Sequence, residues 1–362
     1  MDPMKLRIKR NPNFERLEKV LRREGTPDRV PFYELFSNIE SEVLHAIGKT
    51  HKLSRTNRAN KEHRDRELSQ HINYMFSLGY DYVNVGANNF QFPQKEHPST
   101  STLQGERSYL RAATCTISNR TDFDAYPWPN MSSIDYSPLE HVVKFLPEGM
   151  KVIASGSGGI LENVMWLLGY EKTSYCLYDD EELLQNMFEA VATRIIEHYD
   201  TLSAFDIVGA LVLGEDMGFK TQTLLSPEVY RKYLFPWHAK LVETVHAHGK
   251  PIILHSCGSL TEIMDDIIEC GWDAKHSFED EIEPVWEAKQ RYGDRIALLG
   301  GFDMNKLCLM SEGEVREHTR FLINKCSPGG GWALGTGNSV ANYVPINNFL
   351  VMLEEGGLRG KY

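Results

Sequence analysis

Residues 251–280 read PIILHSCGSLTEIMDDIIECGWDAKHSFED and contain the pattern that decides the fold. The apolar runs at 251–257 and 274–279 have the length and composition of buried strands. The segment between them has the periodic apolar residues of an amphipathic helix. A buried strand, a helix and a second buried strand in succession are typical of a parallel sheet.

The same strand–helix unit recurs along the chain. We expect strands at 29–35, 80–86, 151–157, 209–216, 251–257, 274–279, 296–303 and 330–338. Helix start signals separate most of them: Ser226 before a proline, Ser311 with Glu314 in a capping box, and Asp180 before the amphipathic stretch 181–204.

Eight such units predict an α/β fold, a single (β/α)8 TIM barrel that spans the chain as one domain, residues 1–362. An open doubly wound sheet is the alternative. Two segments depart from the repeat. Residues 1–28 form an N-terminal extension with a helix at 12–24, across the barrel mouth or its underside. Residues 87–150 are expected to be an insertion with some β structure between the second and third strands.

The composition excludes several classes of protein. Of the 362 residues, 41% are apolar and 25% are charged, which is typical of globular proteins and not of disordered or fibrous ones. The net charge is −11 and no basic block is present, so nucleic acid is not an expected partner. No apolar run suits a membrane span or a signal peptide, so we expect a cytoplasmic protein. The six cysteines are too sparse for a disulfide framework.

Polar side chains gather at the carboxyl ends of the expected strands, where TIM-barrel enzymes place their active sites. His255 and Cys257 are two residues apart, so an extended backbone points both to the same side, and Gly258 lets the chain turn away. An imidazole and a thiol directed at one point suit a cation such as Zn²⁺. The alternative is a core histidine beside a cysteine that fills space.

Glu279 is the expected third metal ligand, because it ends the next strand and would stand beside His255 and Cys257. Three protein ligands and one open position are typical of catalytic rather than structural zinc. The alternative is a solvated acidic loop, since acidic residues follow at positions 280, 281 and 283.

The stretch 251–280, with GGFDMN at 300–305 and LGTGNSVANYVP at 334–345, resembles the uroporphyrinogen decarboxylase superfamily and, within it, the zinc- and corrinoid-dependent methyltransferases. The segments RVPFYELF and GEDMGFKTQTLLSPEVY extend the likeness over most of the chain. The related zinc site of cobalamin-independent methionine synthase has a His-x-Cys pair and a Glu at similar spacing, and 24 positions separate His255 from Glu279. The resemblance implies Zn²⁺, a corrinoid carried by a partner protein, and a small-molecule methyl donor or thiol acceptor.

Two departures from the family pattern limit this inference. The methyltransferases have a late cysteine as a further zinc ligand, where this chain has Gly335-Thr336-Gly337-Asn338. The fourth coordination position of the metal would then be filled by water, the substrate, Thr336, Asp303 or another acidic residue. The decarboxylase itself has an Arg-rich N-terminal motif for a polycarboxylate substrate, which residues 29–36 lack. An acidic mouth would repel that substrate, so tetrapyrrole decarboxylation is the runner-up.

Three carboxylates at strand ends are the candidate catalytic residues. Glu215 or Asp216 would donate a proton or orient the substrate, and Glu34 lines the same mouth. For Glu215 and Asp216 the alternative is structural pairing with Lys220 or a nearby arginine.

The glycine-rich run after the third expected strand is a candidate cofactor-binding turn. Backbone N–H groups near Ser155, Ser157 and Gly158 would face an anion, and the glycines would leave room for a bulky cofactor. A tight barrel-top turn is the alternative. We expect three histidines of a neighbouring helix to be surface residues without a role, His238, His246 and His248.

Two directions of methyl transfer are open. With a thiol acceptor, the metal would stabilise the thiolate that attacks the methylated corrinoid. With a methyl donor, it would act as a Lewis acid while the reduced corrinoid removes the methyl group. A non-catalytic relative that binds a corrinoid or a small ligand is also open, because a fold does not imply a function. Related barrels often form homodimers.

Overall fold

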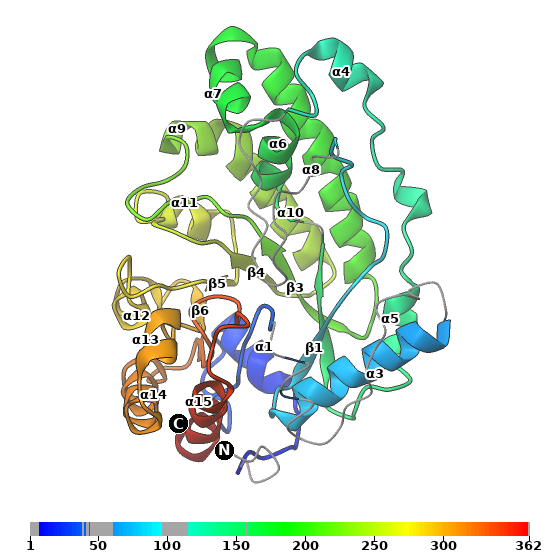
Figure 1. The fold of residues 1–362 in the computed structure, drawn as a ribbon. Helices are drawn as coiled ribbons and strands as arrows, with labels where there is room; N and C mark the ends of the chain where they lie inside the picture. Colours follow the sequence, from blue (N-terminus) through cyan, green and yellow to red (C-terminus); the bar gives the residue numbers. More distant parts are fainter. Residues whose placement is uncertain are drawn as a thin grey trace.

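The computed structural model describes residues 7–37, 40, 43, 61–95, 115–156 and 158–360. Seven parallel strands form one sheet in the order of the sequence. They are β1 (Tyr82–Gly86), β2 (Lys151–Ser155), β3 (Val208–Gly214), β4 (Ile252–His255), β5 (Ala274–His276), β6 (Ala297–Leu299) and β7 (Trp332–Ala333). The sheet lies in the middle of the molecule with helices around it (Figure 1). Because both faces of such a parallel sheet are covered, every residue of β4 is buried.

The first expected strand, 29–35, is attached to this sheet without being a regular strand. Phe32 forms a parallel bridge with Leu334 beyond β7, and Tyr33 N–H donates to the Leu334 carbonyl at 2.8 Å. Pro31 has no N–H to donate, and the Glu34 N–H bonds the Tyr82 hydroxyl of β1. The sheet therefore has seven strands, and segment 29–37 contacts β1 mainly through side chains.

Helices separate the strands. They are α1 (Glu15–Arg22), α3 (Lys61–Ser77), α4 (Arg120–Ala125), α5 (Ser137–Val142), α6 (Ile160–Leu168), α7 (Tyr170–Asp179), α8 (Glu181–Ser203), α9 (Pro227–Val229), α10 (Phe235–Ala247), α11 (Met264–Glu269), α12 (Val285–Tyr292), α13 (Met304–Leu309), α14 (Glu312–Cys326) and α15 (Ile346–Arg359). The capping box of Ser311 and Glu314 is confirmed, and the Asp180 side chain caps α8. None of the described helices has the length and apolar character needed to cross a membrane.

The described part of 87–150 is mainly loops and short helices. Asn88 and Asp135 form an isolated antiparallel bridge, which is the β structure found there. Helices α4 and α5 and a 3-10 turn at Met131–Ser133 lie between residue 115 and β2. The middle of the expected insertion, 96–114, lies outside the described residues.

The helix expected at 12–24 is α1, and it covers the amino-terminal end of the sheet. Phe14 N–H donates to the Gly149 carbonyl just before β2 at 2.8 Å. Arg22 and Arg23 donate to the carbonyls of Gly249 before β4 and Asp294 before β6. Helix α1 therefore lies on the underside, opposite the carboxyl ends of the strands.

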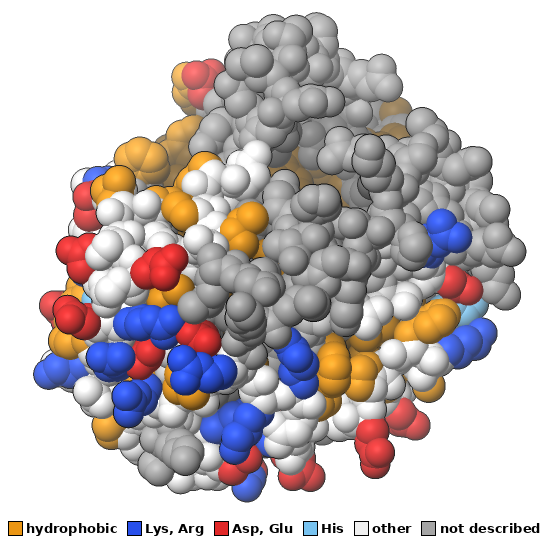
Figure 2. Space-filling view, turned by 60° about the horizontal axis from the view of Figure 1, so that its bottom comes forward, with side chains coloured by type: hydrophobic (Ala, Val, Ile, Leu, Met, Phe, Trp, Pro, Cys, Tyr) orange, Lys and Arg blue, Asp and Glu red, His pale blue; other side chains and the backbone are white. Residues whose placement is uncertain are grey.

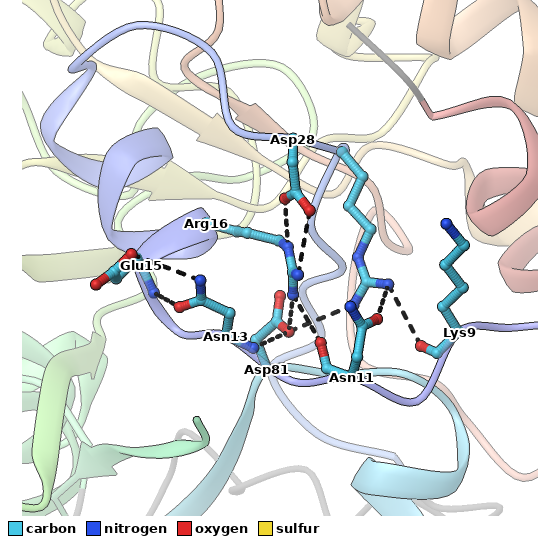
Figure 3. A network of polar contacts seen from close by, with 8 residues as sticks. Lys9, Asn11, Asn13, Glu15, Arg16, Asp28 and Asp81 are labelled. Atoms are coloured by element: carbon cyan, nitrogen blue, oxygen red, sulfur yellow. Dashed lines mark hydrogen bonds and ion pairs between the residues drawn. The ribbon is translucent and has the colours of Figure 1, made fainter. Parts of the chain in front are cut away.

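A buried charge network fastens α1 to this end (Figure 3). Asp81, immediately before β1, accepts hydrogen bonds from the Asn13 N–H at 2.8 Å and from Arg16 at 2.9 Å. Arg16 also contacts Asp28, and Arg29 approaches Asp81 at 3.5 Å. The face seen from below in Figure 1 carries Lys and Arg side chains beside Asp and Glu side chains (Figure 2).

Candidate metal centre

Three potential metal ligands converge at the carboxyl end of the sheet. Asp216 lies two residues after β3, His255 ends β4, and Cys257 follows two residues later. Gly214 of β3 pairs in register with His255, so the two parallel strands end at the same edge. One ligand atom from each of the three residues lies within 4.8 Å of the other two. The predicted pairing of His255 with Cys257 therefore matches the geometry.

The loop backbones hold this cluster together. Asp216 Oδ1 accepts a hydrogen bond from the Cys257 N–H at 2.9 Å. Gly258 has a φ of +82°, and a Cβ there would lie 2.3 Å from the carbonyl carbon of Gly218. A side chain at Gly258 would therefore separate the loop of Asp216 from the loop of Cys257.

The donors fit a zinc ion. Cys257 Sγ lies 3.5 Å from His255 Nε2, which lies 4.0 Å from Asp216 Oδ1. A tetrahedral zinc ion with ligands about 2.0–2.3 Å away holds them roughly 3.5 Å apart. One sulfur, one nitrogen and one oxygen donor also match the preference of this metal. Burial, together with the Asp216 carboxylate, raises the pKa of Cys257 to about 12, so the thiol keeps its proton until a cation displaces it.

His276 decides which nitrogen of His255 faces the cluster. The two Nδ1 atoms lie 2.8 Å apart, and His276 Nε2 lies 3.1 Å from the Thr336 carbonyl oxygen. A carbonyl only accepts, so His276 carries its hydrogen on Nε2. Burial, together with His255, lowers the pKa of His276 well below its usual range, so this ring is neutral and its Nδ1 accepts. His255 therefore donates from Nδ1 and presents the Nε2 lone pair toward Cys257 and Asp216.

Asn338 lies beside Cys257, in the segment where the late cysteine was missing. Its Nδ2 donates to Cys257 Sγ at 3.3 Å, and its Oδ1 accepts from the Ser339 N–H at 2.7 Å. The second bond orients the amide so that its N–H faces the sulfur. Asn338 thus stabilises a thiolate at Cys257, and the cluster consists of three protein donors.

Glu279, the predicted third ligand, lies outside the cluster. Strand β5 ends at His276, which pairs in register with His255, so a histidine occupies the position where the carboxylate was expected. Glu279 begins a turn, and its carbonyl accepts from the Ile282 N–H at 2.9 Å. Burial and the nearby Asp303 raise the pKa of Glu279. In this structure the oxygen donor is instead Asp216, predicted as a catalytic residue.

Glu215 is completely buried and contacts helix α6 instead of the cluster. Its carboxylate accepts hydrogen bonds from the N–H groups of Ile160, Leu161 and Glu162 at 2.5, 3.1 and 3.0 Å. A Cβ on Gly159 would lie 2.3 Å from this carboxyl group. The N–H groups that bond this carboxylate belong to the first turn of α6 and not to the glycine-rich run before it, and the group they bind is an internal side chain at the positive end of the helix.

The prediction that His238 is a surface residue is wrong. His238 is completely buried, with Nε2 3.2 Å from Glu215 Oε2, because this side of α10 packs against β4 and α8. His246 and His248 are partly exposed and pair with Asp273 and Asp200, respectively.

Glu34 lines a pocket of about 380 Å³ at the carboxyl ends of β1 and β2. Its carboxyl group is bonded by the Thr336 N–H at 2.9 Å and contacts the Thr336 hydroxyl. Burial raises the pKa of Glu34 to about 8, although both bonds to Thr336 oppose this shift. Since the Thr336 carbonyl bonds His276, hydrogen bonds connect Glu34 with the metal cluster.

The three predicted cofactor-binding residues have separate environments. Ser155 ends β2 and lines the same pocket as Glu34. Gly158 packs on Trp166, whose ring would lie 2.8 Å from a Cβ at this position. Ser157 lies outside the described residues.

Sequence reasoning does not identify His276, Asn338 or Glu162. The signal for His276 is register, because the residue beside an inward-facing His255 on the next strand also faces inward. Glu162 accepts from the Gly159 N–H at 3.1 Å, and burial with Glu215 and Asp216 raises its pKa to about 8. Its proximity to two carboxylates is visible only after folding.

A family model described as uroporphyrinogen decarboxylase (URO-D) matches residues 120–356. Among solved structures, a methyltransferase from Methanosarcina mazei has a TM-score of 0.71 at 14% identity, over 94% of this chain and 97% of that chain. A β-mannanase from the blue mussel Mytilus edulis has a TM-score of 0.44 at 10% identity, over 90% of each chain. The comparison with curated proteins gives no match.

Proposed function

Since this chain belongs to the uroporphyrinogen decarboxylase family, we propose that it is a metal-dependent methyltransferase, moving a methyl group between a corrinoid protein and a small-molecule donor or thiol acceptor. The observation that carries this proposal is the cluster of Asp216, His255 and Cys257, because decarboxylation of a porphyrinogen requires no metal. We also propose that the protein acts in the cytoplasm. Segment 29–37 would close the sheet into a barrel between β7 and β1.

Each residue at the cluster has a separate role in holding the metal. A zinc ion bound there would polarise an oxygen or nitrogen of a methyl donor, or lower the pKa of an acceptor thiol. Asp216 and Cys257 contribute negative charge, and His255 contributes a neutral nitrogen. His276 orients the His255 ring, and Asn338 donates to the Cys257 sulfur.

Glu34 is the carboxyl group that we assign to proton transfer. It lines a pocket, and with a pKa of about 8 it can hold or release a proton near neutral pH. Glu215 receives a different role, because its carboxylate is saturated by the first turn of α6 and by His238.

The test measures bound zinc and methyl transfer in matched variants. Cys257→Ser and Asp216→Asn should each lose stoichiometric zinc, and turnover should fall at least about a thousandfold, roughly 4 kcal/mol in the activation barrier. Glu279→Gln is the matched control, since it removes a carboxylate that this proposal leaves outside the ligand set. It should keep its zinc.

Other results would reverse these assignments. Full zinc content in Cys257→Ser would remove the ligand set, and loss of zinc in Glu279→Gln alone would restore Glu279 as a ligand. Carbon dioxide release from a porphyrinogen by the metal-stripped protein would favour the decarboxylase. A methylated corrinoid protein that stays methylated with every donor and acceptor would favour a non-catalytic binding protein.

A further inference from the structure

The Glu34 pocket contains groups that the metal cluster does not use. Its described lining includes two carboxyl groups, Glu34 and Glu40, and three aromatic rings, Phe36, Tyr74 and Tyr80. Glu40 Oε2 lies 3.0 Å from His71 Nδ1. The described lining contains no lysine or arginine.

The Tyr80 hydroxyl indicates that the pocket receives a ligand. Tyr80 is only 1% exposed, and its hydroxyl has no hydrogen-bond partner in the described structure. A buried hydroxyl without a partner costs about 1–3 kcal/mol. A polar ligand in the pocket would remove this cost.

Burial, and not the bonds to Thr336, favours the neutral form of Glu34 in the free protein. The Thr336 N–H donates to Glu34 Oε1 at 2.9 Å, and the single hydrogen of the Thr336 hydroxyl is shared between Glu34 Oε2 and the Asn338 carbonyl oxygen. Burial outweighs these bonds and raises the pKa of Glu34 to about 8, so this carboxyl group is mostly protonated at neutral pH.

We propose that this pocket binds the organic reactant as a cation, with methylated ammonium compounds as the chemical class. The inference rests on the proposed methyl transfer and adds the substrate class to it. Binding moves one proton from Glu34 to solvent, and the carboxylate that remains pairs with the ammonium group. The exposed ring of Phe36 would attract the same cation through its π face.

Glu34 is the group whose ionisation should make cation binding in this pocket depend on pH. Three tyrosines near it, Tyr33, Tyr80 and Tyr82, stay neutral because burial raises the pKa of each well above its usual value. The remaining titratable groups of the described lining are Glu40 and His71, which pair with each other. A His71→Gln variant separates the contribution of this pair.

Three probes of similar shape differ in charge: choline, its neutral analogue 3,3-dimethyl-1-butanol, and the anion 3,3-dimethylbutanoate. Titration calorimetry at about pH 8.5 should show choline binding at least about tenfold more tightly than the neutral probe, with no binding of the anion. Between about pH 8.5 and 6.5 the choline affinity should fall roughly twentyfold, since Glu34 must first lose its proton. Two buffers of different ionisation enthalpy should report proton release.

The variants decide whether Glu34 is responsible. Glu34→Gln has the shape of the neutral acid, so it should fold and should lose both the preference for choline and the pH dependence. Glu148→Gln removes an exposed carboxylate near the amino end and should behave like the wild type. His71→Gln should keep the preference.

Contrary results would overturn the inference without ambiguity. Equal or tighter binding of the neutral or anionic probe would reject the cationic substrate, and a choline preference that survives Glu34→Gln would reject Glu34 as the group that pairs with the cation. If that occurred in a protein with zinc-dependent methyl transfer, only this inference would fail. If the protein prefers choline but neither binds zinc nor transfers methyl groups, the pocket would still be a cation-binding site and the methyltransferase proposal would be rejected.

Discussion

The two ends of the sheet use ionisable side chains for opposite purposes. At the amino end, Asp81 is enclosed by Arg16, Arg29 and a backbone N–H, so its charge is compensated within the protein. At the carboxyl end, Asp216 and Cys257 direct electron-rich atoms toward one another and toward His255.

The difference teaches where stability and function lie in this chain. A buried charge with opposite charges beside it supports the folded state, and loss of one partner leaves the others without compensation. Electron-rich atoms that converge gain little from one another and gain much from an added cation. The amino end should therefore control unfolding, and the carboxyl end should control metal binding.

The largest effect on unfolding is expected at Asp81. Asp81→Ala leaves Arg16, only 6% exposed, without its buried partner, and should lower the free energy of unfolding by about 3–5 kcal/mol. Urea denaturation measures this loss. Zinc content of the folded fraction should stay unchanged. A fall in zinc content without a loss of stability would show that Asp81 affects metal binding and not unfolding.

Metal removal is expected to have the next largest effect. Zinc at about 100 times its dissociation constant should stabilise the wild type by about 2.7 kcal/mol, and a chelator should reverse this. Asp216→Asn keeps an acceptor for the Cys257 N–H, so its metal-free stability should match the wild type while the response to zinc disappears. Thermal unfolding with and without zinc measures both. Equal responses of the two proteins would show that zinc binds elsewhere.

His276 should have an intermediate effect, confined to the metal. His276→Phe removes the acceptor that holds the His255 Nδ1–H and should weaken zinc binding about 10–100-fold. His276→Asn places an oxygen near the former Nδ1 position and should recover part of the affinity. Competition with a coloured chelator measures the affinities. Equal affinities of the two variants would assign His276 to packing alone.

The smallest effect is expected at Asp28. Its side chain is 65% exposed although it contacts Arg16, so Asp28→Asn should change the free energy of unfolding by less than about 1 kcal/mol. It is the matched control for Asp81, because both carboxylates bond the same arginine. A loss as large as that of Asp81→Ala would show that exposure does not decide the strength of these contacts.

Particular residues show how far sequence reasoning reaches. The spacing of His255 and Cys257 is local, and a strand places both on one side, so this part of the site was predictable. The end of β5 was misplaced by three residues, and this error put Glu279 in the position that His276 occupies. His238 was assigned to the surface because helix periodicity identifies an apolar face but not a buried polar pair such as His238 with Glu215.

The sequence by itself determined the succession of buried strands and helices, the position of several helix starts, and the delivery of a histidine and a cysteine to one strand end. These follow from local periodicity and capping, which act over a few residues. Only the tertiary structure decided that Asp216 lies beside His255 and Cys257, that His276 contacts the Nδ1 of His255, and that burial raises the pKa of Glu34. Those properties depend on burial and on contacts between strands far apart in the chain, and no local pattern encodes either.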